Sequence, residues 1–420
     1  MLPSPFRNPP LAAAAAATGP WQLGSFRAYA LMRLLWGAAQ EIMTVALAWT
    51  IFQRTHSTLA LGLVGLSSFL PSILLSLVTG VTADRLDRRH IMLACGAALA
   101  VCALGLALLG QGGPLWPVYA IVVVQGVARA FAGPASKAMV PNLAPAGMLS
   151  RVIAAASLVQ GTATIGGPAI GGLLLPLGSG IPFVASAVCA GLAVTAAAAL
   201  GPQRAKHAVR ERPDLAMVLG GFTFVLSQPR ILGAMGLDLV AVLFGSATAL
   251  LPFYVTDVFH AGPWALGVLR MTEALGALAM AAVLTRNPLQ RHVGPKLLMA
   301  VGIYGLATIT FGLSTSLYVG LACMAVLGAS DALSMVTRNA MIQISTPDGM
   351  QGRVAAVHSV TVGASNDLGE FESGLLAHAI GGVPAVVVGG SLALLAAVTW
   401  TWVFPAVRRT DRLEDTLPDR

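Results

Sequence analysis

Charged residues are scarce in this sequence. Asp, Glu, Lys and Arg make up 10% of the 420 residues, whereas about a quarter of the residues in soluble domains are charged. Hydrophobic residues make up 56%, and the mean hydropathy is +0.79. This composition excludes an ordinary soluble globular protein and indicates a polytopic membrane protein.

Cysteines and nucleotide-binding motifs are also sparse. The four cysteines all fall in apolar runs, so we expect neither a disulfide framework nor a metal site. No G-x-x-x-x-G-K-[ST] loop occurs, so we expect no ATP-driven step, no cofactor and no enzymatic activity. The net charge is +8, but Lys and Arg cluster between apolar runs as orientation signals do, and we expect no nucleic-acid binding.

Long apolar runs fill most of the chain, and twelve of them are long enough to cross a bilayer as helices. The first six lie near residues 26–52, 59–83, 91–109, 116–138, 152–176 and 182–200. The second six lie near residues 231–255, 264–284, 297–313, 317–337, 354–379 and 383–404. The sequence therefore predicts an all-α membrane protein with twelve transmembrane helices in two pseudo-symmetric six-helix halves.

Polar segments set the predicted domain boundaries. We expect tails at 1–25 and 406–420, halves at 26–200 and 231–405, and a linker at 201–230. Three cations fall within the spans, Arg33, Arg129 and Arg270, and among the others only Arg54 lies on the side opposite the tails. The positive-inside rule then predicts that both tails and the linker are cytoplasmic.

An internal repeat relates the two halves. With an offset of 202, residues 138–152 align with residues 340–354 without a gap, and Gly172 falls on Gly374. This arrangement of two repeated halves resembles the architecture of major facilitator transporters, and the resemblance implies a substrate site between the halves near the midplane. The same offset places Arg129 and Asp331 at equivalent positions, which suggests that they form a latch between the halves.

Seven acidic residues fall within spans, where a central charge costs about 2.5–3.5 kcal/mol on insertion scales. They are Glu41, Asp238, Glu273, Asp331, Asp367, Glu370 and Glu372. Two interpretations stay open: these carboxylates line an aqueous cavity and carry protons, or they pair with the intramembrane cations and staple the fold. Our candidates for proton coupling are Glu41, Asp331, Asp367, Glu370 and Glu372.

The first span carries one polar face. Arg33, Gln40, Glu41 and Thr44 recur at helical spacing, so this face is expected to line the cavity. Trp36 flanks it and either stacks on a ligand or packs in the core. The candidates for the substrate cavity are Arg33, Trp36, Gln40, Glu41, Arg129, Asp238, Glu273, His358 and Asn366.

The eleventh span carries carboxylates that its copy, the fifth span, does not have. Asp367, Glu370 and Glu372 fall within six residues. Clustered carboxylates cannot all stay ionised in a low dielectric, so the cluster suits a proton carrier. Asn366 shares a stripe with Glu370, and His358 is either a proton relay or a hydrogen-bonded structural residue.

The charged stretch at 80–89 separates the second and third spans and is expected to be a hinge loop. Its residues Gly80, Asp84, Arg85, Arg88 and Arg89 resemble the G-x-x-x-D-R-x-G-R-R loop of the major facilitator superfamily. Asp87 replaces the second glycine of that pattern.

A glycine-rich stretch in the fifth span resembles a second superfamily motif. Gly161, Gly167, Pro168, Gly171 and Gly172 are similar to the antiporter motif of major facilitator exporters. The other interpretation is close packing of small residues, which is common in membrane helices.

Residues 22–405 as a whole resemble the bacterial subgroup that contains the enterobactin exporter and macrolide or multidrug exporters. The resemblance implies a monomeric exporter of the bacterial cytoplasmic membrane that moves amphiphilic small molecules by proton antiport, with membrane lipid around it. A dedicated siderophore exporter and a non-transporting membrane sensor are the alternatives. The family resemblance also implies that Asp84 docks near residues 352–355. Val122 occupies the position where drug:proton antiporters usually carry an Arg, which departs from their coupling scheme.

Overall fold

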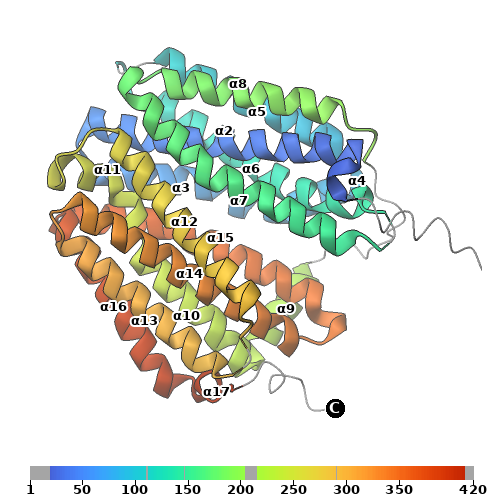
Figure 1. The fold of residues 1–420 in the computed structure, drawn as a ribbon, viewed down its shortest axis with the longest axis vertical. Helices are drawn as coiled ribbons and strands as arrows, with labels where there is room; N and C mark the ends of the chain where they lie inside the picture. Colours follow the sequence, from blue (N-terminus) through green and yellow to red (C-terminus); the bar gives the residue numbers. More distant parts are fainter. Residues whose placement is uncertain (1–18, 110–111, 146, 204–214, 290, 412–420) are drawn as a thin grey trace, which may run out of the picture.

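The computed structural model describes residues 19–109, 112–145, 147–203, 215–289 and 291–411, and this part of the chain contains helices and no strands. The helices form two bundles that lie against each other (Figure 1). The N-terminal bundle contains α2 (Gly24–Thr55), α3 (Thr58–Leu74), α4 (Ser76–Arg85), α5 (Arg88–Leu109), α6 (Trp116–Leu143), α7 (Leu149–Leu174) and α8 (Ile181–Ala198). The C-terminal bundle contains α10 (Pro229–Gly245), α11 (Leu251–Phe253), α12 (Trp264–Arg286), α13 (Val293–Leu313), α14 (Leu317–Ser345), α15 (Gln351–Ile380), α16 (Gly382–Val403) and α17 (Pro405–Arg408).

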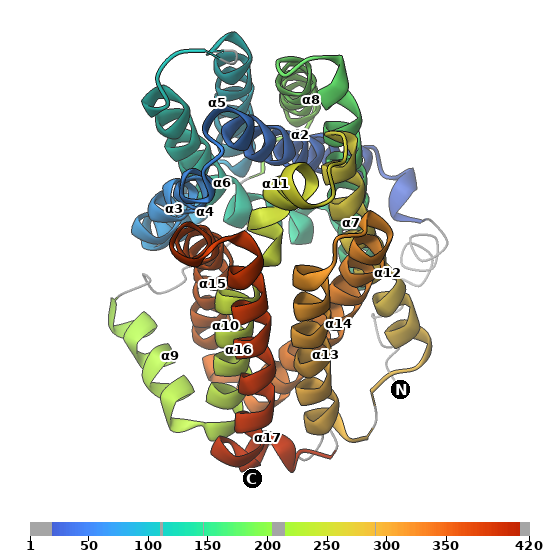
Figure 2. The ribbon, with the colours of Figure 1, turned by 90° about the vertical axis from the view of Figure 1, so that its left-hand side faces the viewer.

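The predicted membrane class is confirmed. Within the described residues, ten helices are long and apolar enough to cross a membrane. Two predicted spans fall outside that set: α3 is apolar but 17 residues long, and α15 has 30 residues but carries the carboxylates. Figure 2 looks along the N-terminal bundle and shows it above the C-terminal bundle.

Two predicted spans are broken. The second, 59–83, consists of α3 and α4 with Leu75 between them, and hydropathy could not reveal this break because both sides are apolar. The seventh, 231–255, ends as α10 at Gly245 and continues through short turns to a π-helical segment, Tyr254–Val258. Pro252 lies in that stretch and has no N–H to donate to the carbonyl of Thr248.

The predicted linker, 201–230, contains a helix that the hydropathy pattern does not predict. Helix α9 (Leu215–Ser227) packs against α15, and Gly221 lies against Arg353. A short apolar helix beside polar sequence gives no spanning signal, so it was missed. Residues 204–214 of the linker, and the predicted tails up to residue 18 and from residue 412, lie outside the described residues.

The expected hinge loop is mostly helical. Gly80 to Arg85 belong to α4, and only Leu86 and Asp87 separate it from α5. The Asp87 carboxylate accepts hydrogen bonds from the N–H groups of Arg89 and Gln203, both at 3.0 Å. The aspartate that departs from the family pattern therefore caps α5 and holds the segment that leaves α8.

Two of the hinge arginines donate hydrogen bonds to backbone carbonyls of neighbouring helices. Arg88 is buried, and its guanidinium donates to the carbonyls of Ala83 and Ala138 at 3.2 and 2.6 Å. Arg89 donates to the carbonyl of Ala198, the last residue of α8. Arg85 is exposed, and the side chain of Asp84 lies outside the described part of the structure.

The two halves touch at one end through pairs of glycines, which we call the glycine end. A methyl group placed on Gly172 of α7 would lie 2.5 Å from Cα of Gly267 of α12. A methyl group on Gly374 of α15 would lie 2.7 Å from Cα of Gly62 of α3. Gly172 and Gly374 are equivalent in the repeat, so the same position of α7 and of α15 contacts the other half.

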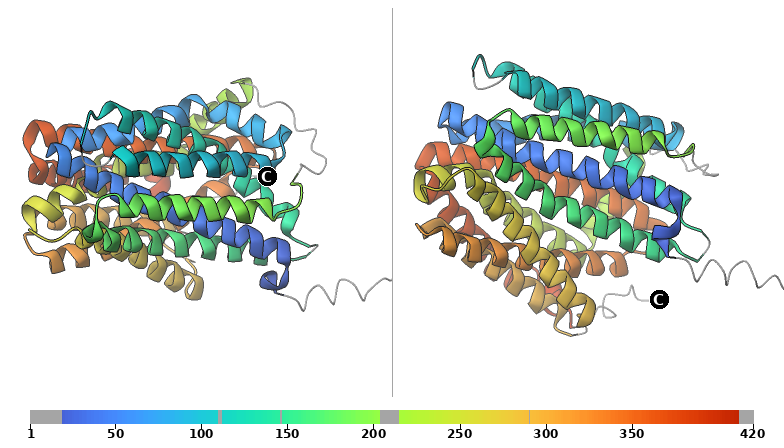
Figure 3. Two further views of the ribbon diagram at one scale, coloured as in Figure 1. Left: turned by 90° about the horizontal axis from the view of Figure 1, so that it is seen from above. Right: turned by 45° about the horizontal axis from the view of Figure 1, so that its top comes forward.

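The halves separate at the other end, which we call the basic end because Arg85, Arg88, Lys137, Arg286 and Arg353 lie there. A cavity of about 320 Å³ lies between α3, α4 and α6 of one half and α15 of the other. In Figure 1 the halves approach at the left and α12 and α14 slant away toward the right; Figure 3 gives two further views. The described conformation is thus closed at the glycine end and open at the basic end.

Candidate functional site

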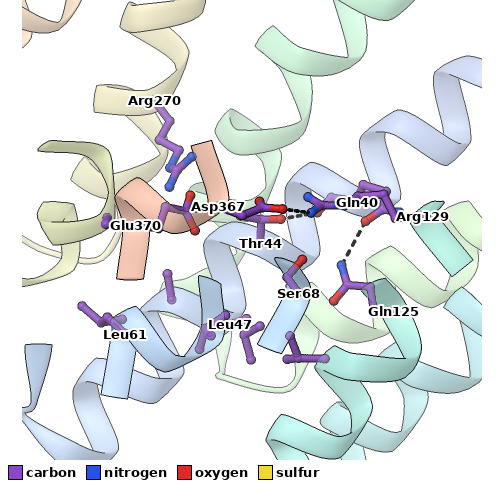
Figure 4. A pocket seen from close by; sticks show the side chains of 14 residues that line it. Gln40, Thr44, Leu47, Leu61, Ser68, Gln125, Arg129, Arg270, Asp367 and Glu370 are labelled. Carbon is purple, nitrogen blue, oxygen red and sulfur yellow. Dashed lines mark hydrogen bonds and ion pairs between the residues drawn. The ribbon is translucent and has the colours of Figure 1, made fainter. Parts of the chain in front are cut away.

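A cavity of about 100 Å³ lies between the halves, and both contribute polar side chains to it (Figure 4). The N-terminal half supplies residues of α2, α3 and α6, and the C-terminal half supplies residues of α12 and α15. The polar lining consists of Gln40, Thr44, Ser68, Gln125, Arg129, Arg270, Asp367 and Glu370. Four predicted site residues therefore meet here: Gln40, Arg129, Asp367 and Glu370.

An ion pair bridges the two halves in this cavity. Arg129 Nη2 of α6 lies 2.7 Å from Asp367 Oδ2 of α15. The Arg129 side chain is 46% exposed and that of Asp367 is 13% exposed, so water reaches the pair from the cavity. The prediction that Arg129 forms a latch with Asp331 was wrong, because the partner of Arg129 is Asp367. Equivalent positions of a repeat face the same axis, but this does not make them neighbours.

Glu370 lies one turn from Asp367 on α15 and belongs to the same wall. Figure 4 shows the guanidinium of Arg270 directed toward the Glu370 carboxylate. Arg270 also donates to the carbonyl of Thr248 at 3.4 Å, which is the acceptor that Pro252 leaves free. The broken seventh span thus positions a cation opposite the carboxylates.

A row of amides completes the wall in the N-terminal half. Gln125 Nε2 donates to Gln40 Oε1 at 2.9 Å. The Nε2 group of Gln40 is buried and has no hydrogen-bond partner among the described residues. A buried donor in a polar cavity calls for a water molecule or a ligand group. Val122 occupies the position where drug:proton antiporters usually carry an Arg. Its side chain is buried in the cavity wall, seven positions before Arg129.

Asp238 does not line this cavity but forms a buried ion pair with Arg338 inside the C-terminal half. Arg338 is not among the predicted intramembrane cations, because the predicted tenth span ends at residue 337, one residue before it. Asp331 and Asp238 line a separate cavity of about 10 Å³ together with Tyr304. Asp238 is thus paired with a cation, as the stapling interpretation expects, but the partner is Arg338 and not Arg33, Arg129 or Arg270.

Glu41 and Glu273 lie near the central cations without lining the cavity. Glu41 is close enough to interact electrostatically with Arg270, Arg129 and Glu370. Glu273 interacts in the same way with Arg270 and Asp331. Charged groups thus continue from the Arg129–Asp367 pair into the C-terminal half.

The remaining predicted residues lie elsewhere. Trp36 is buried in the N-terminal core, as its packing interpretation requires. His358 lines a cavity inside the C-terminal half at the basic end, and Arg33 lines another in the N-terminal half. Asn366 and Glu372 are on α15 but do not line the central cavity. These residues share a helix or a periodicity with the site but face in other directions.

The antiporter-type motif divides in the structure. Gly167 packs against Glu41 and Gly171 against Ile42, both on α2, while Gly172 makes the contact with Gly267. Pro168 is buried within α7. Gly161 has no atom within 4 Å of an added methyl group. The glycines of the motif that pack therefore join α7 to α2 and, at its end, to the other half.

A family model described as a transmembrane secretion effector, of the major facilitator superfamily, matches residues 15–417. The chain belongs to this family. The family and its relatives are membrane transporters and not enzymes, so this chain is a multi-pass membrane transporter of the major facilitator superfamily.

Curated relatives cover nearly the whole chain. The multidrug efflux pump Tap of Mycobacterium tuberculosis is 30% identical over 396 residues, which is 90% of this chain and 93% of the pump. The enterobactin exporter EntS of Citrobacter koseri is 28% identical over 390 residues, 88% of this chain and 91% of the exporter.

Solved structures share the fold at low identity. A variant of the nucleoside transporter NupG gives a TM-score of 0.76 at 11% identity, covering 91% of this chain and all of NupG. A bacterial homologue of the lysosomal transporter Spinster, in an inward-facing state, gives 0.69 at 14% identity, covering 93% and 97%.

Proposed function

We propose that the protein is a secondary active exporter that moves amphiphilic small molecules out of the cell in exchange for protons. The ion pair between Arg129 and Asp367 carries this proposal, because it joins the two halves inside a polar cavity. A proton on Asp367 removes the negative charge and so releases Arg129. Protonation is thereby coupled to how firmly the halves are held together at the cavity.

The described conformation fits one stage of such a cycle. If the basic end is cytoplasmic, as the positive-inside rule predicts, the halves are apart on the cytoplasmic side and in contact at the glycine end. A proton carried inward leaves Asp367 at this stage, and the ionised carboxylate then pairs with Arg129. A proton moving inward gains about 2.3 kcal/mol per 100 mV of membrane potential, which supports uphill export.

The relatives support the direction and class of transport. Tap is named as a multidrug efflux pump and EntS as an enterobactin exporter. The name of EntS supports the alternative that this chain is a dedicated siderophore exporter. The inter-half ion pair in a cavity open to water argues against a sensor, which needs no proton path.

The test compares carboxylates on one helix. In proteoliposomes with an imposed pH gradient, Asp367→Asn and Glu370→Gln are expected to lose uphill transport by at least about tenfold. Glu372→Gln is the matched control, because Glu372 lies on α15 outside the cavity. The substrate panel contains amphiphilic compounds of both charges.

Retention of uphill transport by both Asp367→Asn and Glu370→Gln would contradict the coupling role. Equal accumulation of the panel in expressing and empty cells, with and without an uncoupler, would contradict export altogether. Downhill exchange that survives in Asp367→Asn while uphill transport is lost would be the strongest support.

A further inference from the structure

We infer that the N-terminal half holds a second binding site, for the anionic head group of an amphiphile, in a cavity at the basic end. The cavity measures about 410 Å³ and lies between α2, α6 and α7. Its lining consists of Tyr29, Arg33, Lys137, Val140, Pro141, Ile153, Ala156, Ser157 and Gln160. None of these residues lines the central cavity, so this inference does not depend on the proposed transport.

The cavity is positively charged. Arg33 and Lys137 line it, and no carboxylate is among its described lining residues. Lys137 is exposed and, within the described residues, has no ion-pair partner. An amine on a cavity wall without a counter-charge is available to an anion.

Arg33 is held in place by a neutral partner. Its Nη2 group donates to Gln160 Oε1 at 2.5 Å, and Gln160 Nε2 lies 3.4 Å from the hydroxyl of Thr164. The amide orients the guanidinium without neutralising it, and the other guanidinium nitrogens remain for a ligand. Planar guanidinium groups suit carboxylate and phosphate oxygens.

The rest of the lining suits an apolar body. Val140, Pro141, Ile153 and Ala156 contribute aliphatic surface, and Tyr29 contributes a ring. The volume falls within the range of about 300–1,000 Å³ that small-molecule sites occupy. A cationic wall beside an apolar one selects an amphiphile with a negative head group.

The internal repeat provides a comparison within the same molecule. The C-terminal half has an equivalent cavity of about 200 Å³. With the offset of 202, Lys137 corresponds to Asn339, Val140 to Ile342 and Ala156 to His358, and all three counterparts line that cavity. The cavity itself is therefore a property of the fold, whereas the uncompensated lysine belongs to one copy only.

Lysines near helix ends also orient membrane proteins, and that role alone would require no cavity. Two observations go beyond it: Lys137 lines a cavity of ligand size, and Arg33 shares that cavity from a position within a predicted span. The head group could belong to a lipid or to a free anionic amphiphile, and the chemistry recognised is the same.

The experiment measures binding to the purified full-length protein in a neutral maltoside detergent by native mass spectrometry. The probes are dodecyl phosphate, dodecyltrimethylammonium as its cationic counterpart, and phosphatidylglycerol. Lys137→Asn, which introduces the residue of the other half, is expected to weaken dodecyl phosphate binding by at least about tenfold, because it removes a charge-assisted contact; tenfold corresponds to about 1.4 kcal/mol. Lys137→Arg should restore it.

Arg286→Asn is the matched control, because it removes one exposed cation from the same end outside the cavity. The inference fails if Lys137→Asn binds dodecyl phosphate as the wild type does, if Arg286→Asn weakens binding equally, or if the cationic probe binds as tightly. Displacement of dodecyl phosphate by phosphatidylglycerol identifies a lipid head group as the occupant. Simultaneous binding of both identifies a free amphiphile.

Discussion

Among single residues, Asp238 and Arg338 illustrate how charge is accommodated inside the C-terminal half. Both are almost fully buried, at 5% and 3% exposure. Breaking a buried pair by removing one partner leaves an uncompensated charge, whereas replacing both with apolar residues of similar size is often neutral.

We therefore expect Asp238→Leu and Arg338→Met each to destabilise the protein by about 3–5 kcal/mol. The double variant should recover most of that loss. Thermal unfolding of the detergent-solubilised protein measures all three. A double variant as unstable as the single ones would show that the pair contributes more than mutual neutralisation.

The sequence located the carboxylates of the site but not their partners. Asp367 and Glu370 were identified because their repeat copy has no carboxylates. Arg129 was assigned to Asp331 by repeat symmetry, but symmetry does not fix which helices meet across the interface, and α15 brings Asp367 to it. The contribution of Arg270 depends on a break in the seventh span that hydropathy does not reveal.

Among the helices, α7 and α12 determine how the glycine end closes. Their contact at Gly172 and Gly267 leaves no room for a side chain. Close packing against Gly267 therefore accounts for the glycine at position 172 of the antiporter-type motif. Close packing against Glu41 accounts for the glycine at position 167.

Gly172→Ala is accordingly expected to shift the conformational equilibrium away from closure at the glycine end. Overpacking costs about 1–3 kcal/mol, which changes the ratio of the two states by at least about fivefold. Spin-label distances across that end would record the change. Gly166→Ala on the same helix is the control, because an added methyl group there meets nothing within 4 Å. Identical distances in the two variants would argue against the steric mechanism.

Helix positions were predictable where apolar runs were long and bounded by charge. Helices α5, α13 and α16 lie close to their predicted ranges, 91–109, 297–313 and 383–404. The break at Leu75 and the short helix α9 were not predictable, because a break within apolar sequence and a helix too short to span leave the hydropathy pattern unchanged.

For the whole molecule, the charged stretch at α4 and α5 lies at the end where the halves are apart. Asp84 is in the last turn of α4, and α15 begins at Gln351 in the other half. A helix N-terminus carries unpaired N–H groups and attracts a carboxylate. The open state is then the one in which this attraction is weakest.

Asp84→Asn is expected to express normally, transport poorly and populate the conformation open at the basic end. A carboxylate at a helix N-terminus contributes about 0.3–1 kcal/mol, and up to about 2 when partly buried; a loss of about 1.4 kcal/mol shifts the equilibrium about tenfold. Crosslinking of cysteine pairs across the basic end measures the shift, with Arg85→Gln as the control. Unchanged crosslinking in Asp84→Asn would rule out a latch.

Because the halves touch at the glycine contacts, each half can rotate as a rigid body about a point near one face of the membrane. The contact of α15 is at Gly374, 23 residues from the start of the helix at Gln351, which is about 35 Å at 1.5 Å per residue. A rotation of about 10° about that contact moves the start of the helix by about 6 Å. Asp367 lies seven residues from Gly374, about 10 Å along the helix, so the same rotation moves it by about 2 Å. A small angular change can thus break one ion pair while it opens or shuts a passage as wide as a small molecule.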